Sequence, residues 1–247
     1  SHPSSGSRIV THLILQSPMS SISWSSQFSR RWFNPQAWAL RVQKYKARLK
    51  TSDRYLPVRA LRQSLRLPSV AHRQFWAGDH TDEPSLAFLA DALPENGVFF
   101  DIGANIGVYS TALWLAKQEK LTIQAFEPIP STVKVLTEMF QLNHVKADVN
   151  AIALSNSEGT LTLSAYENGS NNFWVTDADA DLPTLSVPTM TLDDWMLVHP
   201  DCIPNAIKID VEGHELSVLK GAKATLAAYT PALMLECHCG SWDQLGV

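Results

Sequence analysis

An acid and two glycines interrupt an apolar stretch in the middle of the chain, VFFDIGANIGVYS (residues 98–110). The apolar residues before Asp101 predict a buried strand, and the residues after Gly107 predict a helix. A loop between a strand and a helix can present free backbone N–H groups to an anionic group. Gly103 and Gly107 are separated by three residues, however, so the loop lacks the G-x-G-x-x-G turn that binds the pyrophosphate of a dinucleotide.

A second acid, Glu127, ends the next predicted strand, residues 121–127. A carboxylate in this place can accept two hydrogen bonds from a ribose diol, and it would repel the phosphate of an NADP-type cofactor. Asp101, which ends its own strand, can receive an ammonium group. An ammonium, a ribose diol and no pyrophosphate turn indicate S-adenosylmethionine rather than NAD. The structural alternatives are that Glu127 favours the start of a helix at Pro128 and that Asp101 caps the loop.

Acids and histidines near the C-terminus have spacings that could support catalysis. Side chains alternate along a strand, so Glu236 and His238 share one face if the strand extends that far. Asp210 ends the strand expected beside it, and His214 follows on the first turn of a helix. These four side chains could therefore converge near a bound methyl donor. A histidine with a near-neutral pKa could take the proton of an alcohol, and a carboxylate could orient it.

The same oxygens and imidazoles could instead hold a divalent metal that lowers the pKa of the hydroxyl. No trio among them follows a metal-binding spacing, so we expect a metal-free base.

Beyond residue 80, predicted helices and strands alternate. This pattern predicts an α/β fold with a doubly wound, mostly parallel sheet. Ligands of such sheets bind at the carboxyl ends of the strands, where the strand order reverses. The expected helices are 83–93, 107–118, 131–143 and 214–228; the expected strands are 98–103, 121–127, 148–153, 206–210 and 232–237, with extra strands on either side of a polar excursion at 167–182.

Five stretches in order resemble one protein family: FFDIGANIGVYS, AFEP, NAIALSNSEGTLTL, VPTMTLDDW and IKIDVEGHELSVLKGA. They are similar to the FkbM-type S-adenosylmethionine-dependent methyltransferases, over roughly residues 84–240. The resemblance implies a class I methyltransferase fold and, usually, O-methylation of a hydroxyl on a sugar, glycan or natural product. The resemblance places Asp101, Gly103 and Asn105 around the methionine moiety and Glu127 at the ribose. It places residues 153–155 near the adenine. The expected cofactor-binding residues are Asp101, Gly103, Asn105, Gly107, Glu127, Pro128, Ala153 and Ser155.

Charge divides the chain into a basic N-terminal part and an acidic remainder. Residues 1–78 hold 13 of the 20 Lys and Arg and a single acid, a net charge of +12, and the rest of the chain carries −16. We therefore expect a basic, partly helical N-terminal extension over residues 1–80 and a methyltransferase domain over residues 81–247. The extension could pack as a cap, through a helix over residues 38–50. Alternatively, residues 30–73 could bind nucleic acid, so the other functions considered are an RNA methyltransferase and a nucleic-acid-binding protein.

No stretch approaches the roughly 20 apolar residues of a membrane-spanning helix, and no secretory signal is apparent. Three cysteines, an odd number, suggest reduced thiols, so we expect a cytoplasmic protein. The sequence ends nine residues after His238, before the last helix and the closing β-hairpin that the resemblance implies, so the hairpin is expected to be absent. A homo-oligomer partner or the N-terminal helices could cover the sheet edge that this leaves exposed.

Overall fold

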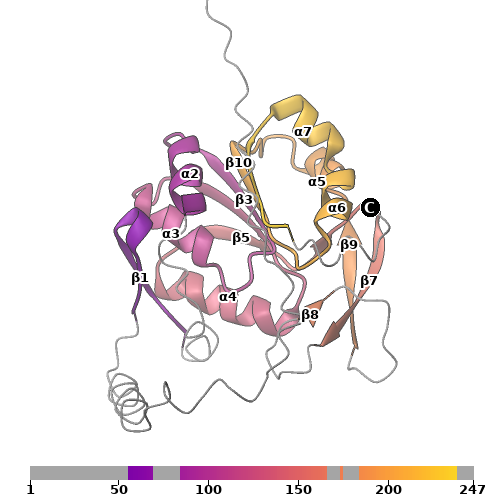
Figure 1. Cartoon of the computed structure of the whole chain (residues 1–247), viewed down its shortest axis with the longest axis horizontal. Coiled ribbons are helices and arrows are strands. Elements are labelled where there is room, and N and C mark those ends of the chain that lie inside the picture. The colour runs from indigo at the N-terminus through magenta and orange to yellow at the C-terminus, as the bar shows by residue number, and fades with distance from the viewer. Residues whose placement is uncertain (1–54, 69–83, 166–172, 175–183, 238–247) are drawn as a thin grey trace, which may run out of the picture.

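A central sheet of five strands organises the protein. The computed structural model describes residues 55–68, 84–165, 173–174 and 184–237 (Figure 1). All four strand pairings in the sheet are parallel. The strands are β3 (Val98–Ile102), β4 (Thr122–Phe126), β5 (Ala147–Asn150), β10 (Ala206–Ile209) and β11 (Ala232–Leu235).

The strand order is β11-β10-β3-β4-β5. The chain first adds β4 and β5 on one side of β3, and it later adds β10 and β11 on the other side. The order therefore reverses between β3 and β10. The prediction of a doubly wound, mostly parallel α/β sheet is confirmed. The carboxyl ends of β3 and β10 lie at the point where such sheets bind ligands.

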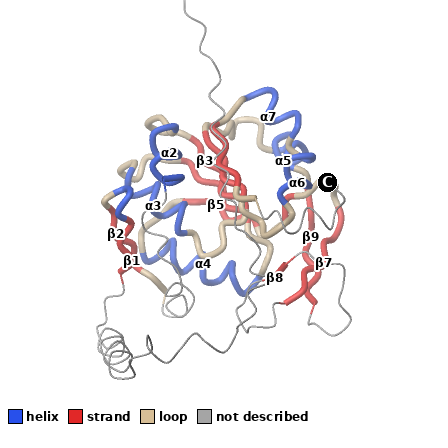
Figure 2. The backbone as a smooth tube through the Cα atoms, viewed as in Figure 1, coloured by secondary structure: helices blue, strands red, loops and turns tan. Residues whose placement is uncertain are grey.

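Helices cover both faces of this sheet (Figures 1 and 2). Side chains of β3 pack against helices on both faces: Phe99 packs with one group of helices, and Phe100 and Ile102 pack with a second group on the other face. Because consecutive side chains of a strand point to opposite faces, a sheet covered on both sides requires this continuous apolar run. The first group comprises α2 (Pro84–Ala92), α3 (Val108–Ala116) and α4 (Pro130–Leu142); the second comprises α5 (Leu192–Val198), α6 (Glu215–Gly221) and α7 (Lys223–Tyr229).

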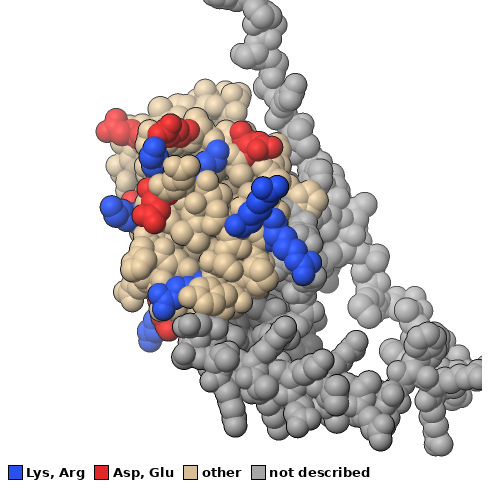
Figure 3. All heavy atoms as spheres, turned by 90° about the vertical axis from the view of Figure 1, so that its left-hand side faces the viewer, with Lys and Arg blue, Asp and Glu red and all other residues tan. Residues whose placement is uncertain are grey.

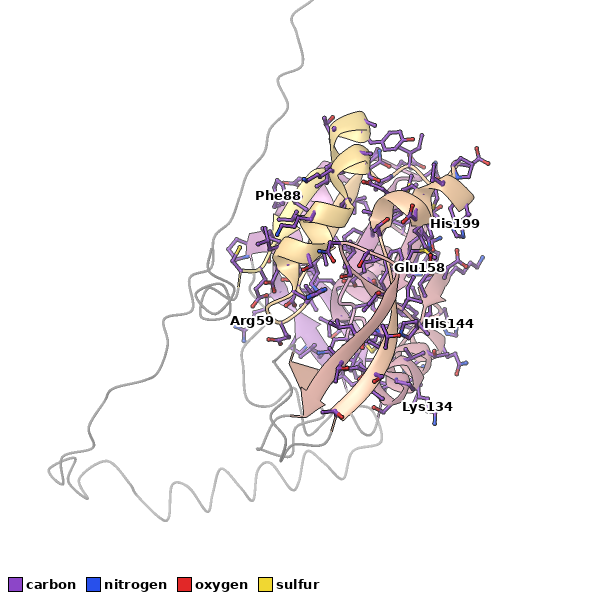
Figure 4. The ribbon with its side chains drawn as sticks, turned by 90° about the vertical axis from the view of Figure 1, so that its right-hand side faces the viewer. Arg59, Phe88, Lys134, His144, Glu158 and His199 are labelled. Atoms are coloured by element: carbon purple, nitrogen blue, oxygen red, sulfur yellow. The ribbon has the colours of Figure 1, made fainter. Side chains whose placement is uncertain are left out.

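A smaller sheet follows β5 in the chain and confirms the expected extra strands. Its order is β6-β9-β7-β8, and β7 and β9 pair antiparallel over most of their length. Figure 4 looks at the side of the molecule where these two strands lie in front. The expected polar excursion falls outside the described residues, except for β8. The strands are β6 (Ala153–Leu154), β7 (Gly159–Ala165), β8 (Phe173–Trp174) and β9 (Thr184–Met190).

The described part of the basic extension is a β-hairpin, not a helix. Strands β1 (Tyr55–Val58) and β2 (Gln63–Arg66) pair antiparallel around the 3-10 turn η1 (Arg59–Leu61). Val58 and Leu65 are buried in one cluster with residues of α2 and α3. The expected helix at residues 38–50 lies outside the described part of the chain, so a partly helical extension stays a prediction. The domain boundary at residue 80 stays a prediction.

The predicted helix over residues 214–228 is instead two short helices that meet at Ala222. The break follows Gly221, where a Cβ atom would lie 1.9 Å from the carbonyl oxygen of Ser155. Close packing of α6 against β6 thus requires glycine at this position. Within the described residues, every helix is too short or too polar to traverse a lipid bilayer.

Candidate active site

Gly103 and Gly107 allow the loop after β3 to pack closely against two other segments. Both have positive φ, 75° and 81°. A Cβ atom on Gly103 would lie 1.8 Å from the carbonyl oxygen of Asp210, and one on Gly107 would lie 2.5 Å from a methyl group of Leu136. Glycine is therefore required at both positions by backbone conformation and by space.

Four N–H groups of this loop donate to other parts of the protein, whereas the sequence suggested that they would be free for an anionic group. Those of Gly103 and Ala104 both donate to the carbonyl oxygen of Phe126, and that of Gly107 donates to Ala104. The N–H of Asn105 donates to Oε2 of Glu127 at 3.0 Å. The loop therefore holds the end of β4 in place, which agrees with the absence of a pyrophosphate turn.

Glu127 is a buried carboxylate at the carboxyl end of β4, with only 5% of its surface exposed. Its Oε1 accepts a hydrogen bond from the N–H of Ile129 at 3.0 Å, and its Oε2 accepts the one from Asn105. Burial raises the pKa of Glu127 to about 7, although the two N–H donors act in the opposite direction. Each oxygen keeps a lone pair after these bonds, so the carboxylate can still accept two hydrogen bonds from a ligand.

Glu127 lies on the wall of a cavity at the point where the strand order reverses. The loops after β3, β4 and β10 supply Gly103, Asn105, Pro128 and Asp210. The small sheet supplies much of the opposite, apolar wall. The remaining lining residues are Ile102, Phe126, Ile129, Thr132, Ile152, Ala153, Leu154, Leu161, Leu163, Val211, Glu212 and His214.

Asp101 lies beneath this cavity rather than on its wall, and its side chain is fully buried. Its Oδ2 accepts hydrogen bonds from the hydroxyl of Ser110 at 2.6 Å and from the backbone N–H of Ser110 at 3.3 Å. Its Oδ1 lies 3.5 Å from Nζ of Lys208. Oδ1 has no hydrogen-bond partner among the described residues, and a direct contact between Asp101 and a ligand ammonium stays a prediction.

Lys208, which the sequence reasoning missed, is a buried cation behind the site. Its Nζ lies 3.2 Å from Oδ2 of Asp210 and donates to the carbonyl oxygen of Gly103 at 3.1 Å. It also lies 5.2 Å from the ring centre of Tyr109. Burial by itself would lower the pKa of Lys208, but Asp210 and Asp101 outweigh it and raise the pKa above the usual range. A lysine between two isoleucines, two residues before Asp210, was the available signal in the sequence.

Of the four catalytic candidates, Asp210 and His214 lie on the cavity wall. Glu236 directly follows β11, and its N–H donates to the carbonyl oxygen of Ile209 at 2.9 Å, so its backbone lies beside the end of β10. The expected adjacency of these two strands is confirmed. His238 lies outside the described residues, and its position near the others stays a prediction.

Glu212 also lines the cavity and was not among the predicted site residues. Its φ is 53°, a left-handed conformation that residues other than glycine seldom adopt. Asn105, on the wall with it, has a φ of 50°. Unusual backbone conformations of this kind concentrate at functional sites.

Ser155 and His214 form a hydrogen bond, although the sequence suggested a cofactor-binding role for Ser155 and a catalytic role for His214. The hydroxyl of Ser155 and Nε2 of His214 are 2.9 Å apart. Burial lowers the pKa of His214, so its imidazole is neutral near pH 7. Ser155 is itself buried, while Ala153 and Leu154 before it line the cavity. Contact between Ser155 and an adenine base stays a prediction.

No group of three or more His, Cys, Asp and Glu within the described ranges is arranged to hold a metal ion.

Comparison with known families identifies the chemistry of this fold. The model of the methyltransferase FkbM domain matches residues 101–244, more than half of the chain. The chain belongs to the FkbM methyltransferase family. The matched region begins at Asp101, near the end of β3, and includes the loops after β3, β4 and β10. S-adenosylmethionine is, in general, the methyl donor that such a family implies.

Two curated relatives are also methyltransferases. The hexuronic acid methyltransferase AglP of Haloferax volcanii is 28% identical over 163 residues, which cover 64% of this FkbM-family chain and 63% of that protein. The methyltransferase sdnD of Sordaria araneosa is 31% identical over 160 residues, covering 52% of this chain and 61% of that protein. The chain therefore spans less than two thirds of the length of these relatives.

Proposed function

We propose that this chain binds S-adenosylmethionine in the cavity and transfers its methyl group to a hydroxyl of a sugar, a glycan or another natural product. The observation that carries the proposal is the buried carboxylate of Glu127, anchored by two backbone N–H groups on the cavity wall. A sugar acceptor is supported by the name of the AglP relative, a hexuronic acid methyltransferase.

Glu127 is suited to bind the ribose. Both of its oxygens have a backbone N–H partner that fixes the plane of the carboxylate, and each retains a lone pair toward the cavity. Two hydroxyl groups on adjacent carbons can donate to these two oxygens. Ala153, Leu154 and Leu161 on the cavity wall offer an apolar surface to the adenine.

Gly103 and Asp210 form the part of the wall where the methionine moiety would lie. Gly103 lies on this wall, and its lack of a side chain lets the loop after β3 pack against the carbonyl oxygen of Asp210. Lys208 holds the carbonyl oxygen of Gly103 and the carboxylate of Asp210 in place from behind. Asp101, buried behind the wall with Lys208, is thus proposed to support the loop.

The bound donor supplies a methyl group on a sulfonium, which needs an aligned nucleophile more than it needs activation. The acceptor oxygen forms a bond to this methyl carbon while the carbon–sulfur bond breaks, and the electron pair stays on the sulfur. The proton of the hydroxyl must then go to a base. His214 is neutral near pH 7, lies on the wall and can take this proton, while Ser155 orients its ring.

Glu236 and His238 remain proposed parts of the same catalytic group. Glu236 follows the strand beside β10, and the i, i+2 spacing would place His238 on the same side if β11 continued. His238 would then be a second candidate for the base.

The test combines product analysis with donor binding. The full chain is incubated with isotopically labelled S-adenosylmethionine and candidate glycans, lipids and RNA, and the products are identified by mass spectrometry. Calorimetry with the donor should show affinity at least about tenfold weaker in Glu127→Gln, because each hydrogen bond to a charged acceptor contributes about 1.5–3 kcal/mol. Glu138→Gln, at an exposed position on α4, is the control and should bind the donor normally.

Unchanged affinity in Glu127→Gln would exclude Glu127 from the donor site. Methyl transfer to RNA but not to glycans would support the alternative function, an RNA methyltransferase that uses the basic segment at residues 30–73.

A further inference from the structure

The hydroxyl of Ser155 has two hydrogen-bond contacts but only one hydrogen. It lies 2.9 Å from Nε2 of His214, and it donates to Oδ1 of Asn156 at 3.3 Å. A carbonyl oxygen such as Oδ1 can only accept a hydrogen bond, whereas an imidazole nitrogen can accept or donate one. Both contacts are therefore satisfied only if Nε2 carries a hydrogen and donates it to Ser155. The neutral ring is then protonated at Nε2 and has its free lone pair at Nδ1.

The backbone of Ser155 is held on both sides, which gives its hydroxyl oxygen a defined position. Its N–H donates to the carbonyl oxygen of Met190 at 2.8 Å. Its carbonyl oxygen abuts α6, where a Cβ atom on Gly221 would lie only 1.9 Å away. With the backbone held, the direction of the O–H bond depends on the acceptors within reach, and Oδ1 of Asn156 is one of them.

Charged groups around this turn do not offer His214 another partner. The turn, residues 155–159, contains one charged residue, the exposed Glu158 (Figure 4). Figure 3 shows the opposite side of the molecule, toward β1, α2 and α3, where Lys and Arg are interspersed with acids. The charge of Glu215 raises the pKa of His214 less than burial lowers it. Among the described residues, the contact with Ser155 is the hydrogen bond that the imidazole forms.

We propose that Asn156 is a positioning residue that, through Ser155, keeps His214 protonated at Nε2, so that Nδ1 takes the proton of the acceptor hydroxyl. The inference rests on the proposed function and identifies the atom that acts in it. As the acceptor oxygen bonds to the methyl carbon, its hydrogen moves to Nδ1 and the carbon–sulfur electron pair stays on sulfur. Nε2 keeps its hydrogen throughout, so Ser155 does not relay the proton. The imidazolium then releases the Nδ1 proton to water.

Nitrogen NMR of the free, full chain tests the protonation of the ring directly. The histidine nitrogens are isotopically labelled, and the signals of His214 are assigned by their loss in His214→Ala. Spectra are recorded at about pH 8, where a histidine of ordinary or lowered pKa is neutral. We expect a protonated Nε2 and an unprotonated Nδ1. A ring protonated at Nδ1 in the parent protein would overturn the proposal.

Two substitutions of Asn156 test its role as the acceptor. Asn156→Asp keeps an oxygen that accepts from Ser155, so both the ring protonation and the rate of methyl transfer should be retained. Asn156→Ala removes the acceptor, so the hydroxyl can turn to Nε2 and rings protonated at Nδ1 should appear. Such rings cannot take a proton at Nδ1. The single-turnover rate should therefore fall with the competent fraction that NMR reports, roughly two- to tenfold, while donor affinity is unchanged.

Ser157→Asp is the matched control for the charge that Asn156→Asp introduces. Ser157 is exposed and directly follows Asn156, and within the described residues its side chain has no hydrogen bond to Ser155 or His214. This variant should leave the ring protonation and the rate unchanged. The proposal would be overturned if Asn156→Ala behaved like Ser157→Asp, because Asn156 would then have no influence on the ring.

The outcomes also separate this inference from the proposed function. The NMR measurement needs neither donor nor acceptor, so it decides the ring protonation even without turnover. Failure to bind the donor, or to methylate any candidate acceptor, would refute the proposed function and with it the role of Nδ1 as the base. The expected ring protonation together with an unchanged rate in Asn156→Ala would refute the inference and leave the proposed methyltransferase standing.

Discussion

The Ser155 hydroxyl lies 2.9 Å from Nε2 of His214, and this contact joins the end of β6 to the start of α6 at the cavity wall. It connects the segment expected near the adenine with a histidine expected near the reacting groups. Because Ser155 is buried, the orientation of the imidazole is determined from the protein side. His214 can therefore face an acceptor without being oriented by the ligand.

We expect His214→Ala to lower methyl transfer by about 10²–10⁴-fold, the usual loss when a general base is removed. Donor affinity should change little, because the ribose is held by Glu127. Single-turnover rates and calorimetry separate the two effects. His199→Ala is the control: this exposed histidine stacks on Trp195, outside the cavity lining, and its loss should leave the rate unchanged.

The rate should also rise with pH through the lowered pKa of His214, because only the neutral imidazole accepts a proton. The apparent pKa should lie below 6.5, the usual value for histidine. A pH profile that persists unchanged in His214→Ala would contradict the assignment of the base.

Donor affinity should increase between about pH 6 and pH 8, because the pKa of Glu127 is about 7 and only the ionised carboxylate offers all its lone pairs. Calorimetry across this range should give a flat profile for Glu127→Gln. The stability of the free protein should change with pH in the opposite direction. The folded-state pKa of Glu127 exceeds the ordinary 4.5, so its contribution to stability falls as pH rises from about 4.5 to about 7.

Glu127→Gln should weaken donor binding at pH 8 and lower the stability of the free protein only slightly, because Gln keeps one acceptor oxygen for the N–H groups of Asn105 and Ile129 and carries no buried charge. A variant that is largely unfolded under the binding conditions would indicate a structural role for Glu127 instead.

Lys208→Met should destabilise the fold by about 3–5 kcal/mol, the usual cost of leaving a buried charge without its partner. The loss arises because Asp101 and Asp210 then face each other's charge across the loop after β3. Chemical denaturation measures it. Lys120→Met is the matched control, since Lys120 and Glu95 form an ion pair that is largely exposed to water, and its unfolding midpoint should hardly move.

The double variant Asp101→Asn, Lys208→Met should recover part of the lost stability, because it removes one of the unpaired charges. No recovery would mean that Lys208 stabilises the fold through packing on Tyr109 rather than through charge.

Leu65→Ala should cost about 2–5 kcal/mol, because Leu65 is fully buried in the cluster shared by the hairpin, α2 and α3. Such a loss supports the basic extension as a packed cap. Arg62→Ala, on an exposed side chain, should not affect the unfolding midpoint. If RNA affinity falls in Arg62→Ala and Leu65→Ala leaves stability intact, the segment acts as a nucleic-acid arm.

His238→Ala should lower turnover while donor affinity is retained, if His238 acts with Glu236 and Asp210. A chelator should leave the parent enzyme active. Inhibition by the chelator that added magnesium or manganese reverses would make these side chains metal ligands. A structure of the complete site with the side chains of His238 and Asp210 more than about 10 Å apart would exclude shared catalysis, because hydrogen bonds reach about 3 Å, or one water further.

The sequence alone determined the α/β class and the main strands, and it predicted the place of the ligand. These follow from local patterns: apolar runs that alternate with helical periodicity, and an acid at the end of each of the first two strands of the sheet. Glu127 could be predicted because the end of a strand next to the glycine loop has a known position in a doubly wound sheet. Near this loop, short-range spacing and fold geometry were sufficient to predict which residues lie at the carboxyl ends of the strands.

Only the tertiary structure decided the partners of these residues, because each pair comes from segments far apart in the chain. Lys208 and Asp101 meet since β10 pairs beside β3, and Ser155 reaches His214 since Gly221 brings α6 against β6. The amides after β3 bind Phe126 and Glu127, which no local pattern predicts. Val58 and Leu65 of the hairpin at residues 55–66 are likewise buried against α2 and α3, which follow later in the chain.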